Sequence, residues 1–94
     1  MFQMGQLYAT CGVANRIAED DAFKQFVYAS LWRYLSQDWG EMVEEDKALS
    51  DRAILEEEGR IFGAYQNAEH PDWHIWIITE AERTITTILF PDEY

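Results

Sequence analysis

The chain has 94 residues, the length of a single domain spanning 1–94, and 48% of them are hydrophobic and 15% aromatic. This composition excludes a disordered chain and predicts a small packed core. Asp and Glu outnumber Lys and Arg by 18 to 7, a formal charge of −11. A surface so acidic repels phosphate backbones and anionic membranes, so we expect no direct binding to nucleic acid or membrane.

Cysteine usage and hydropathy point to the cytoplasm. The single cysteine, Cys11, cannot form an internal disulfide or supply a cysteine-based zinc site. No apolar run approaches the roughly 20 residues that span a bilayer, and the first residues lack the pattern of a signal peptide. Neither an Asp-x-Asp-x-Asp-Gly loop nor a Glu-x-x-His pair occurs, so we expect no metal or cofactor.

The first third of the chain predicts one strand followed by two helices. Apolar residues alternate over 2–9, which indicates a strand that ends near Thr10, and Gly12 separates it from a short helix over 13–18. Asp20 resembles an N-cap, and the i, i+3, i+4 spacing that follows predicts a helix over about 21–36. Tyr28 and Trp32 lie four residues apart on this helix, either completing the core or forming an exposed pair that could bind a partner.

The middle of the chain predicts a turn, a helix and a strand. Asp38-Trp39-Gly40 reads as a turn that Trp39 anchors against the core. An imperfect apolar stripe predicts a helix over 44–58, and Gly59 is a natural stop. A strand over 60–68 follows, and a turn at 69–72 contains a proline.

The C-terminal third predicts the hairpin on which the fold depends. Two runs rich in β-branched and aromatic residues, 73–79 and 84–91, are joined by the polar link 80–83. Trp76 and Ile78 lie on one face of the first run, and Ile75 and Ile77 lie on the other. Strands apolar on both faces are usually covered on both, so we place this hairpin centrally. We expect an α+β domain of order β-α-α-α-β-β-β, in which two or three helices pack on an antiparallel sheet of three or four strands. The sequence leaves open where the strand over 2–9 joins this sheet.

Several segments resemble a family of small, uncharacterised bacterial proteins related to plasmids and other mobile elements. The resemblance rests on Gly5-Gln6-Leu7, Ala9-Thr10, Asp38-Trp39-Gly40, Glu45-Asp46-Lys47, Ile75-Trp76-Ile77-Ile78-Thr79-Glu80-Ala81, Thr86-Thr87-Ile88-Leu89 and Pro91-Asp92-Glu93-Tyr94. It spans most of the chain, although 13–35 match loosely, and it implies no activity. Members commonly have a histidine just before the Asp-Trp-Gly turn; Tyr34 stands there in this sequence, which puts any role of that imidazole in doubt.

Half of the acidic residues fall between 38 and 58, and they form the main candidate site. One interpretation is a negatively charged ridge that imitates a phosphate array and occupies the basic groove of a nucleic-acid-binding protein. The alternative is a solvated helix face, because acidic helices are common. As partner-binding residues we single out Glu41, Glu44, Glu45, Asp46, Asp51, Glu56 and Glu57, with the aromatic residues Trp39, Trp32 and Tyr28.

The alternative is a small ribonuclease-like enzyme or a toxin-derived relative, because a helix-then-antiparallel-sheet layout is that of barnase-like proteins and of the bacterial toxins related to them. His74, Arg83, Thr86 and Thr87 could gather on one side of the hairpin to supply acid, base and cation. This is an analogy of fold, and the charge of −11 counts against it. We therefore expect a small acidic cytoplasmic binding protein without catalysis, carried by a mobile element, whose partner is a protein with a basic surface. In its most specific form it is an anti-restriction or anti-CRISPR inhibitor.

Overall fold

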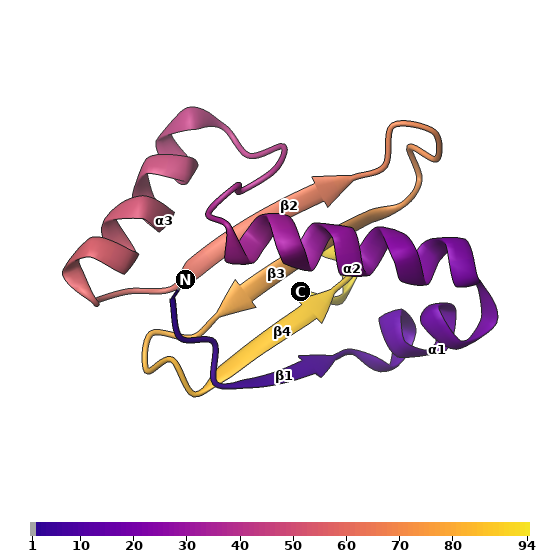
Figure 1. The fold of residues 1–94 in the computed structure, drawn as a ribbon, viewed down its shortest axis with the longest axis horizontal. Helices are drawn as coiled ribbons and strands as arrows, with labels where there is room; N and C mark the ends of the chain where they lie inside the picture. Colours follow the sequence, from indigo (N-terminus) through magenta and orange to yellow (C-terminus); the bar gives the residue numbers. More distant parts are fainter. Residues whose placement is uncertain (1) are drawn as a thin grey trace.

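The computed structural model describes residues 2–94, and within them three α-helices pack on a four-stranded sheet (Figure 1). The α+β class and the order β-α-α-α-β-β-β are confirmed. The elements are β1 (Gln6–Ala9), α1 (Cys11–Glu19), α2 (Asp21–Leu35), α3 (Glu44–Glu56), β2 (Ile61–Gln66), β3 (His74–Thr79), β4 (Ile85–Leu89) and a 3-10 turn, η1 (Pro91–Glu93).

The strand order is β1-β4-β3-β2, so the C-terminal hairpin supplies the two interior strands, as expected. β3 pairs antiparallel with both β2 and β4, but β1 runs parallel to β4. The expectation of a purely antiparallel sheet was therefore wrong. Alternation over 2–9 indicates a strand but does not identify the strand beside it. Consecutive strands joined by short links pair antiparallel, but three helices separate β1 from the other strands, so this rule does not apply to it.

Strand β1 is also shorter than the predicted strand over 2–9, because Gly5 has φ +68° and interrupts the extended backbone before Gln6. Phe2 and Met4 precede it and pack against the core as partly buried residues. On the other side, the hydroxyl of Thr10 accepts a hydrogen bond from the Val13 N–H and begins α1 at Cys11, two residues before the predicted start.

The core lies between α2 and one face of the sheet (Figure 1). Phe23, Phe26 and Val27 of α2 are buried there, as the helical spacing predicts. From the sheet, Ile75 and Ile77 of β3 point to this side and are fully buried. The apolar face of α2 and the apolar side chains of β3 are buried against each other. This burial stabilises the domain by about 25 cal/mol for each Å² of apolar surface removed from water.

A chain of buried hydroxyl groups crosses the core beside Tyr34. The Tyr34 hydroxyl lies 3.1 Å from the Ile61 carbonyl oxygen and 2.7 Å from Thr79 Oγ1. Thr79 Oγ1 lies 2.7 Å from Thr86 Oγ1, which is 2.8 Å from the Met4 carbonyl oxygen. The three hydroxyl groups have one proton each, so at any moment they can donate only three of these four hydrogen bonds. Burial raises the pKa of the Tyr34 hydroxyl, which keeps it protonated and able to donate.

We predict that Tyr34→Phe lowers the free energy of unfolding by about 1–3 kcal/mol, because it leaves buried oxygens with too few protons. Urea denaturation measures this loss. Tyr28→Phe removes the same hydroxyl from an exposed tyrosine and is expected to change nothing. Equal stability of the two variants would show that the buried chain contributes nothing.

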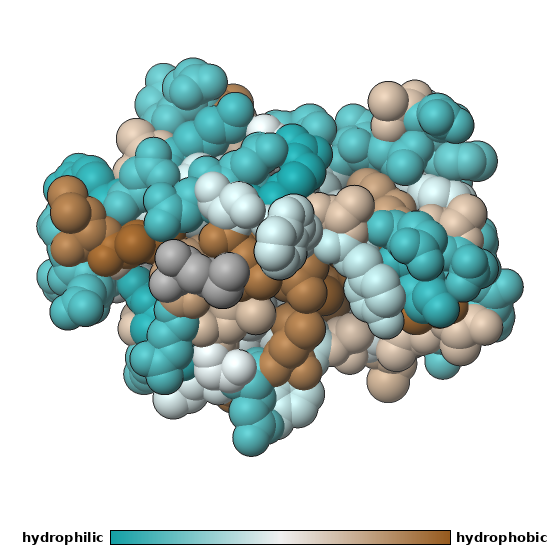
Figure 2. Space-filling view, viewed as in Figure 1, coloured by the Kyte–Doolittle hydropathy of each residue, from teal (hydrophilic) through white to brown (hydrophobic). Residues whose placement is uncertain are grey.

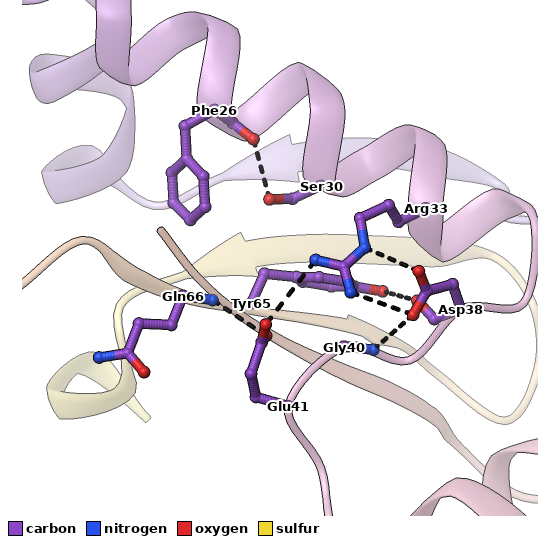
Figure 3. A network of polar contacts seen from close by, with 8 residues as sticks. All are labelled: Phe26, Ser30, Arg33, Asp38, Gly40, Glu41, Tyr65 and Gln66. Carbon is purple, nitrogen blue, oxygen red and sulfur yellow. Dashed lines mark hydrogen bonds and ion pairs between the residues drawn. The ribbon is translucent and has the colours of Figure 1, made fainter. Parts of the chain in front are cut away.

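A second network fixes the turn between α2 and α3 (Figure 3). The Arg33 guanidinium donates to both carboxylate oxygens of Asp38, at 2.8 and 3.2 Å, and the Gly40 N–H donates to Asp38 Oδ1 at 3.1 Å. Tyr65 donates to the Asp38 carbonyl oxygen at 2.8 Å. The hydrogen bond from Arg33 holds the pKa of Asp38 below its usual value. The Asp-Trp-Gly turn is therefore built as part of the scaffold, with Trp39 only 2% exposed, which confirms its predicted role as an anchor.

The outer edge of β2 is closed by this turn and by α3. The N–H and C=O of Phe62 bond to the Ser50 hydroxyl at 3.1 and 2.9 Å. The N–H of Ala64 donates to the Trp39 carbonyl at 3.0 Å, and its C=O accepts from the Glu41 N–H at 2.7 Å. The Gln66 N–H donates to a carboxylate oxygen of Glu41 at 3.1 Å. No further strand can add along this edge without displacing these partners.

Candidate functional site

Helix α3 carries most of the predicted site, and its charges lie at its two ends. Glu44, Glu45 and Asp46 form its first turn, where carboxylates complement the helix dipole. Glu56 closes the helix and is followed by Glu57 and Glu58, with no basic residue in the last turn. At 1.5 Å per residue the two groups are about 18 Å apart. Carboxylates at a helix C-terminus oppose the dipole, so the second group is not placed for stability.

Few basic residues neutralise these carboxylates. Lys47 lies 3.7 Å from Glu44, and Arg52 lies 3.3 Å from Glu56; of these four side chains only that of Lys47 is partly buried. Exposed pairs of this kind contribute about 0–1 kcal/mol. In Figure 2 hydrophilic side chains, in teal, dominate the region of α3, and hydrophobic ones, in brown, reach the surface beside them. Leu55, 83% exposed, and Leu49 are the exposed leucines of this helix.

A groove of about 470 Å³ runs beside α3 on the face of the sheet that α2 leaves uncovered. The residues on its wall come from α3 and the loop before it, from β2 and β3, and from the C-terminal residue; they are Met42, Asp46, Leu49, Ser50, Arg60, Phe62, Ala64, Trp76 and Tyr94. Its volume is within the range of about 300–1,000 Å³ typical of small-ligand sites, and its floor is mostly apolar. Asp46 and Leu49 belong to both the groove and α3, so the carboxylates and the groove form one surface.

Aromatic side chains shape the floor of the groove. Trp76 packs edge-on against Phe62, at 5.1 Å between ring centroids, and against Tyr94, at 5.5 Å. Arg60 lies over the Tyr94 ring, donates to its hydroxyl at 3.0 Å, and pairs with Glu80 at 3.5 Å. Sequence reasoning missed this groove, because four separate segments build it. Only the apolar second face of the strand at 73–79 hinted that something lay there.

Three of the predicted partner-binding residues have structural roles. Trp39 is buried, and its indole N–H donates to Asp51 Oδ1 at 2.9 Å. Placing Trp39 on a binding surface was therefore wrong, because its ring fills the core and its one polar atom is already bonded. Asp51 is exposed but holds that ring in place. Glu41 is likewise engaged, by Arg33 at 3.8 Å and by the Gln66 N–H.

Tyr28 and Trp32 lie on the outer surface of α2, 56% and 66% exposed. The interpretation that they complete the core was wrong, and the alternative of an exposed pair is confirmed. They are on the opposite side of the sheet from the groove, since α2 covers the face that carries Ile75 and Ile77. The aromatic pair and the α3 surface are therefore separate.

The residues proposed for ribonuclease chemistry do not meet. His74 and Arg83 lie at opposite ends of the β3 region, and Thr86 is buried on the helix-covered face. Arg83 instead donates to the Ala53 carbonyl at 2.8 Å and to the Gly59 carbonyl at 2.6 Å, so it caps the C-terminal end of α3. Sequence alone could not reveal this, because the cap joins segments 30 residues apart.

The other histidine and the single cysteine of the chain do not join these residues. His70 stacks on Trp73, at 4.0 Å between ring centroids, and Cys11 is exposed. Among residues 2–94 no three His, Cys, Asp or Glu side chains converge into a possible metal site. No helix in this part of the chain is both long enough and apolar enough to cross a membrane.

Comparison with protein-family models, with curated protein sequences and with solved structures finds no significant match to this chain. The resemblance to mobile-element proteins thus stays a prediction.

Proposed function

We propose that this chain is a non-catalytic binding protein and that α3 with its adjoining groove engages a protein with a basic surface. The observation that supports it best is the continuity of exposed carboxylates with an apolar groove through Asp46 and Leu49. The carboxylates would steer and orient a basic partner, and the groove would hold an apolar side chain from it. Such a division of roles is common at protein interfaces, where charge sets the association rate and buried apolar groups slow dissociation.

The acidic residues at the C-terminal end of α3, where they oppose the helix dipole, also support this proposal. Three consecutive acidic residues follow Leu55, and Glu57 adopts the left-handed conformation with φ 54°. A position that opposes the dipole and strains the backbone costs stability, and such costs are expected where a surface has a function.

In its most specific form, the partner is a nucleic-acid-binding defence protein of the restriction or CRISPR type, met in the cytoplasm. The two acidic groups of α3 would then take the place of phosphates in its basic groove. The carrier would be a plasmid, phage or other mobile element.

The test is affinity capture from host lysate with mass spectrometry, using wild type and two matched variants. One variant carries Glu→Gln at four α3 positions, Glu44, Glu45, Glu56 and Glu57. The control loses the same charge elsewhere, at the exposed Glu19, Glu69, Glu82 and Asp92, as Gln or Asn. We expect wild type and control to capture the same basic protein and the α3 variant to lose it.

Kinetics on the captured protein separate the two parts of the surface. The α3 variant is expected to associate at least about tenfold more slowly, with the difference shrinking as salt is added. Leu49→Ala is expected to speed dissociation instead. If the α3 variant and the control bind equally well, the acidic residues are only a solvated helix face and the proposal fails.

A further inference from the structure

The outer edge of β1 is an open strand edge. The Gln6 N–H donates to the Thr84 carbonyl at 2.9 Å and the Thr10 N–H to the Ile88 carbonyl at 3.0 Å, so every second residue points toward β4. Leu7 and Ala9 lie between them and turn their N–H and C=O groups outward. All four residues of β1 are exposed, and among residues 2–94 no helix or strand lies along its outer side (Figure 1). The opposite edge of the sheet, on β2, is closed by Ser50 and residues 39–41.

This open edge is also formed by the uncharged part of an acidic chain, and one carboxylate, that of Glu93, lies just beyond its C-terminal end, where it accepts a hydrogen bond from Thr10. Residues 2–15 contain no Asp, Glu, Lys or Arg, while the remainder holds all 25 charged side chains. Leu7 and Tyr8 are 44% and 50% exposed, and brown and pale residues reach the surface near β1 (Figure 2). Proteins normally protect an edge strand by keeping it short or with charges, proline or a covering segment. Within residues 2–94, β1 has none of the last three, and its four residues leave a short open edge.

We propose that β1 pairs antiparallel with β1 of a second copy of this chain, around a twofold axis at Tyr8. A second copy is the fitting occupant because two molecules of charge −11 repel each other everywhere except at an uncharged surface. Joined at this edge, the two sheets become one continuous sheet, and the carboxylates of α3 remain at its far ends beyond β2.

The register follows from which groups face outward. With the axis at Tyr8, Leu7 of one copy faces Ala9 of the other, and each such pair exchanges two N–H···O=C bonds, four in total. The two Tyr8 residues form the non-hydrogen-bonded pair between them, with Cα atoms about 4.5 Å apart. A shift by two residues in either direction would require Gly5, which has φ +68°, or Cys11, which begins α1, to be extended.

The contact is short, so the dimer is of the weak class and salt strengthens it. Added salt screens the repulsion between two acidic copies. Added salt is expected to weaken binding of a basic partner, so its effect on the dimer is the opposite. The salt dependence therefore distinguishes the dimer from the proposed function, and the dimer does not depend on that function.

The first test is sedimentation equilibrium of the purified chain from low micromolar to near-millimolar concentration. We expect a monomer–dimer equilibrium that shifts toward dimer at high salt. Tyr8→Lys places two like charges at the axis and is expected to weaken dimerisation at least about tenfold. Tyr28→Lys makes the same change on the exposed surface of α2 and is expected to leave it intact. Thermal unfolding of both variants checks that the monomer is folded.

The second test is oxidation of Tyr8→Cys in a Cys11→Ser background. Two cysteines in a non-hydrogen-bonded pair lie within the 4.4–6.8 Å Cα range of disulfides, so we expect a covalent dimer. In the same background Gln6→Cys is the control, because in this register the two Gln6 Cα atoms are about 13 Å apart or more. A monomer at all concentrations, or equal cross-linking of both variants, would overturn the proposal.

Discussion

Gly40→Ala is expected to destabilise the domain by about 3 kcal/mol or more. Gly40 has φ +80°, and a Cβ there would overlap the Ala64 carbonyl oxygen and lie 2.8 Å from Tyr65 Cδ1. Left-handed backbone costs a side chain about 1–2 kcal/mol. To make room, residues 39–41 must also separate from β2 and lose their hydrogen bonds to Ala64, at about 1 kcal/mol each.

Gly59→Ala is the matched control for this measurement. Gly59 has a similar φ, +87°, but the nearest atom to its Cβ is Ala53 Cβ at 4.0 Å. We expect urea denaturation to show a loss of about 1–2 kcal/mol there, from the backbone conformation alone. Equal losses at both positions would mean that the turn does not lie as close to β2 as described.

Ile77→Ala is expected to cost about 3–4 kcal/mol, although isoleucine is a smaller side chain than the neighbouring tryptophan. Ile77 is fully buried in the middle of an interior strand, and truncation there leaves a cavity. The whole domain is stable by only about 5–14 kcal/mol, at roughly 0.05–0.15 kcal/mol per residue. Thermal unfolding should therefore show a large fall in Tm.

Trp76→Ala serves as the comparison and is expected to cost only about 2 kcal/mol. Trp76 points to the groove side of β3 and is half-buried. We therefore expect roughly half of the ~3–5 kcal/mol that Trp→Ala costs at a fully buried position. If Trp76→Ala were the more damaging of the two, the groove face would be covered in solution.

Predictions from local patterns succeeded where a single segment decides the outcome. The spacing of Phe23, Phe26 and Val27 identified α2, because one buried stripe on a helix is enough to show in the sequence. The two β-branched runs identified β3 and β4 as interior strands, because strands covered on one face and shaped into a groove on the other are apolar on both.

Predictions failed where distant segments meet. The parallel pairing of β1 with β4 leaves no trace in either strand, since alternation is the same for both directions. Trp39 was correctly expected to anchor a turn, yet the same residue was also placed on a binding surface, and only the structure shows that Asp51 satisfies its indole N–H. Arg83 reads as a free cation until its contacts with the end of α3 are seen.

The pairing of β1 with β4 also determines when the domain can fold. Gln6 lies beside Ile85, so β1 leaves the ribosome long before β4, the strand with which it pairs. Until the hairpin is synthesised, α1 and α2 have no sheet to cover, and the apolar side of α2 stays in contact with water or chaperones. Contacts this distant in sequence make folding slow for a chain of this size. Strand β1, which carries no charged residue, therefore lacks its pairing partner until β4 has been synthesised.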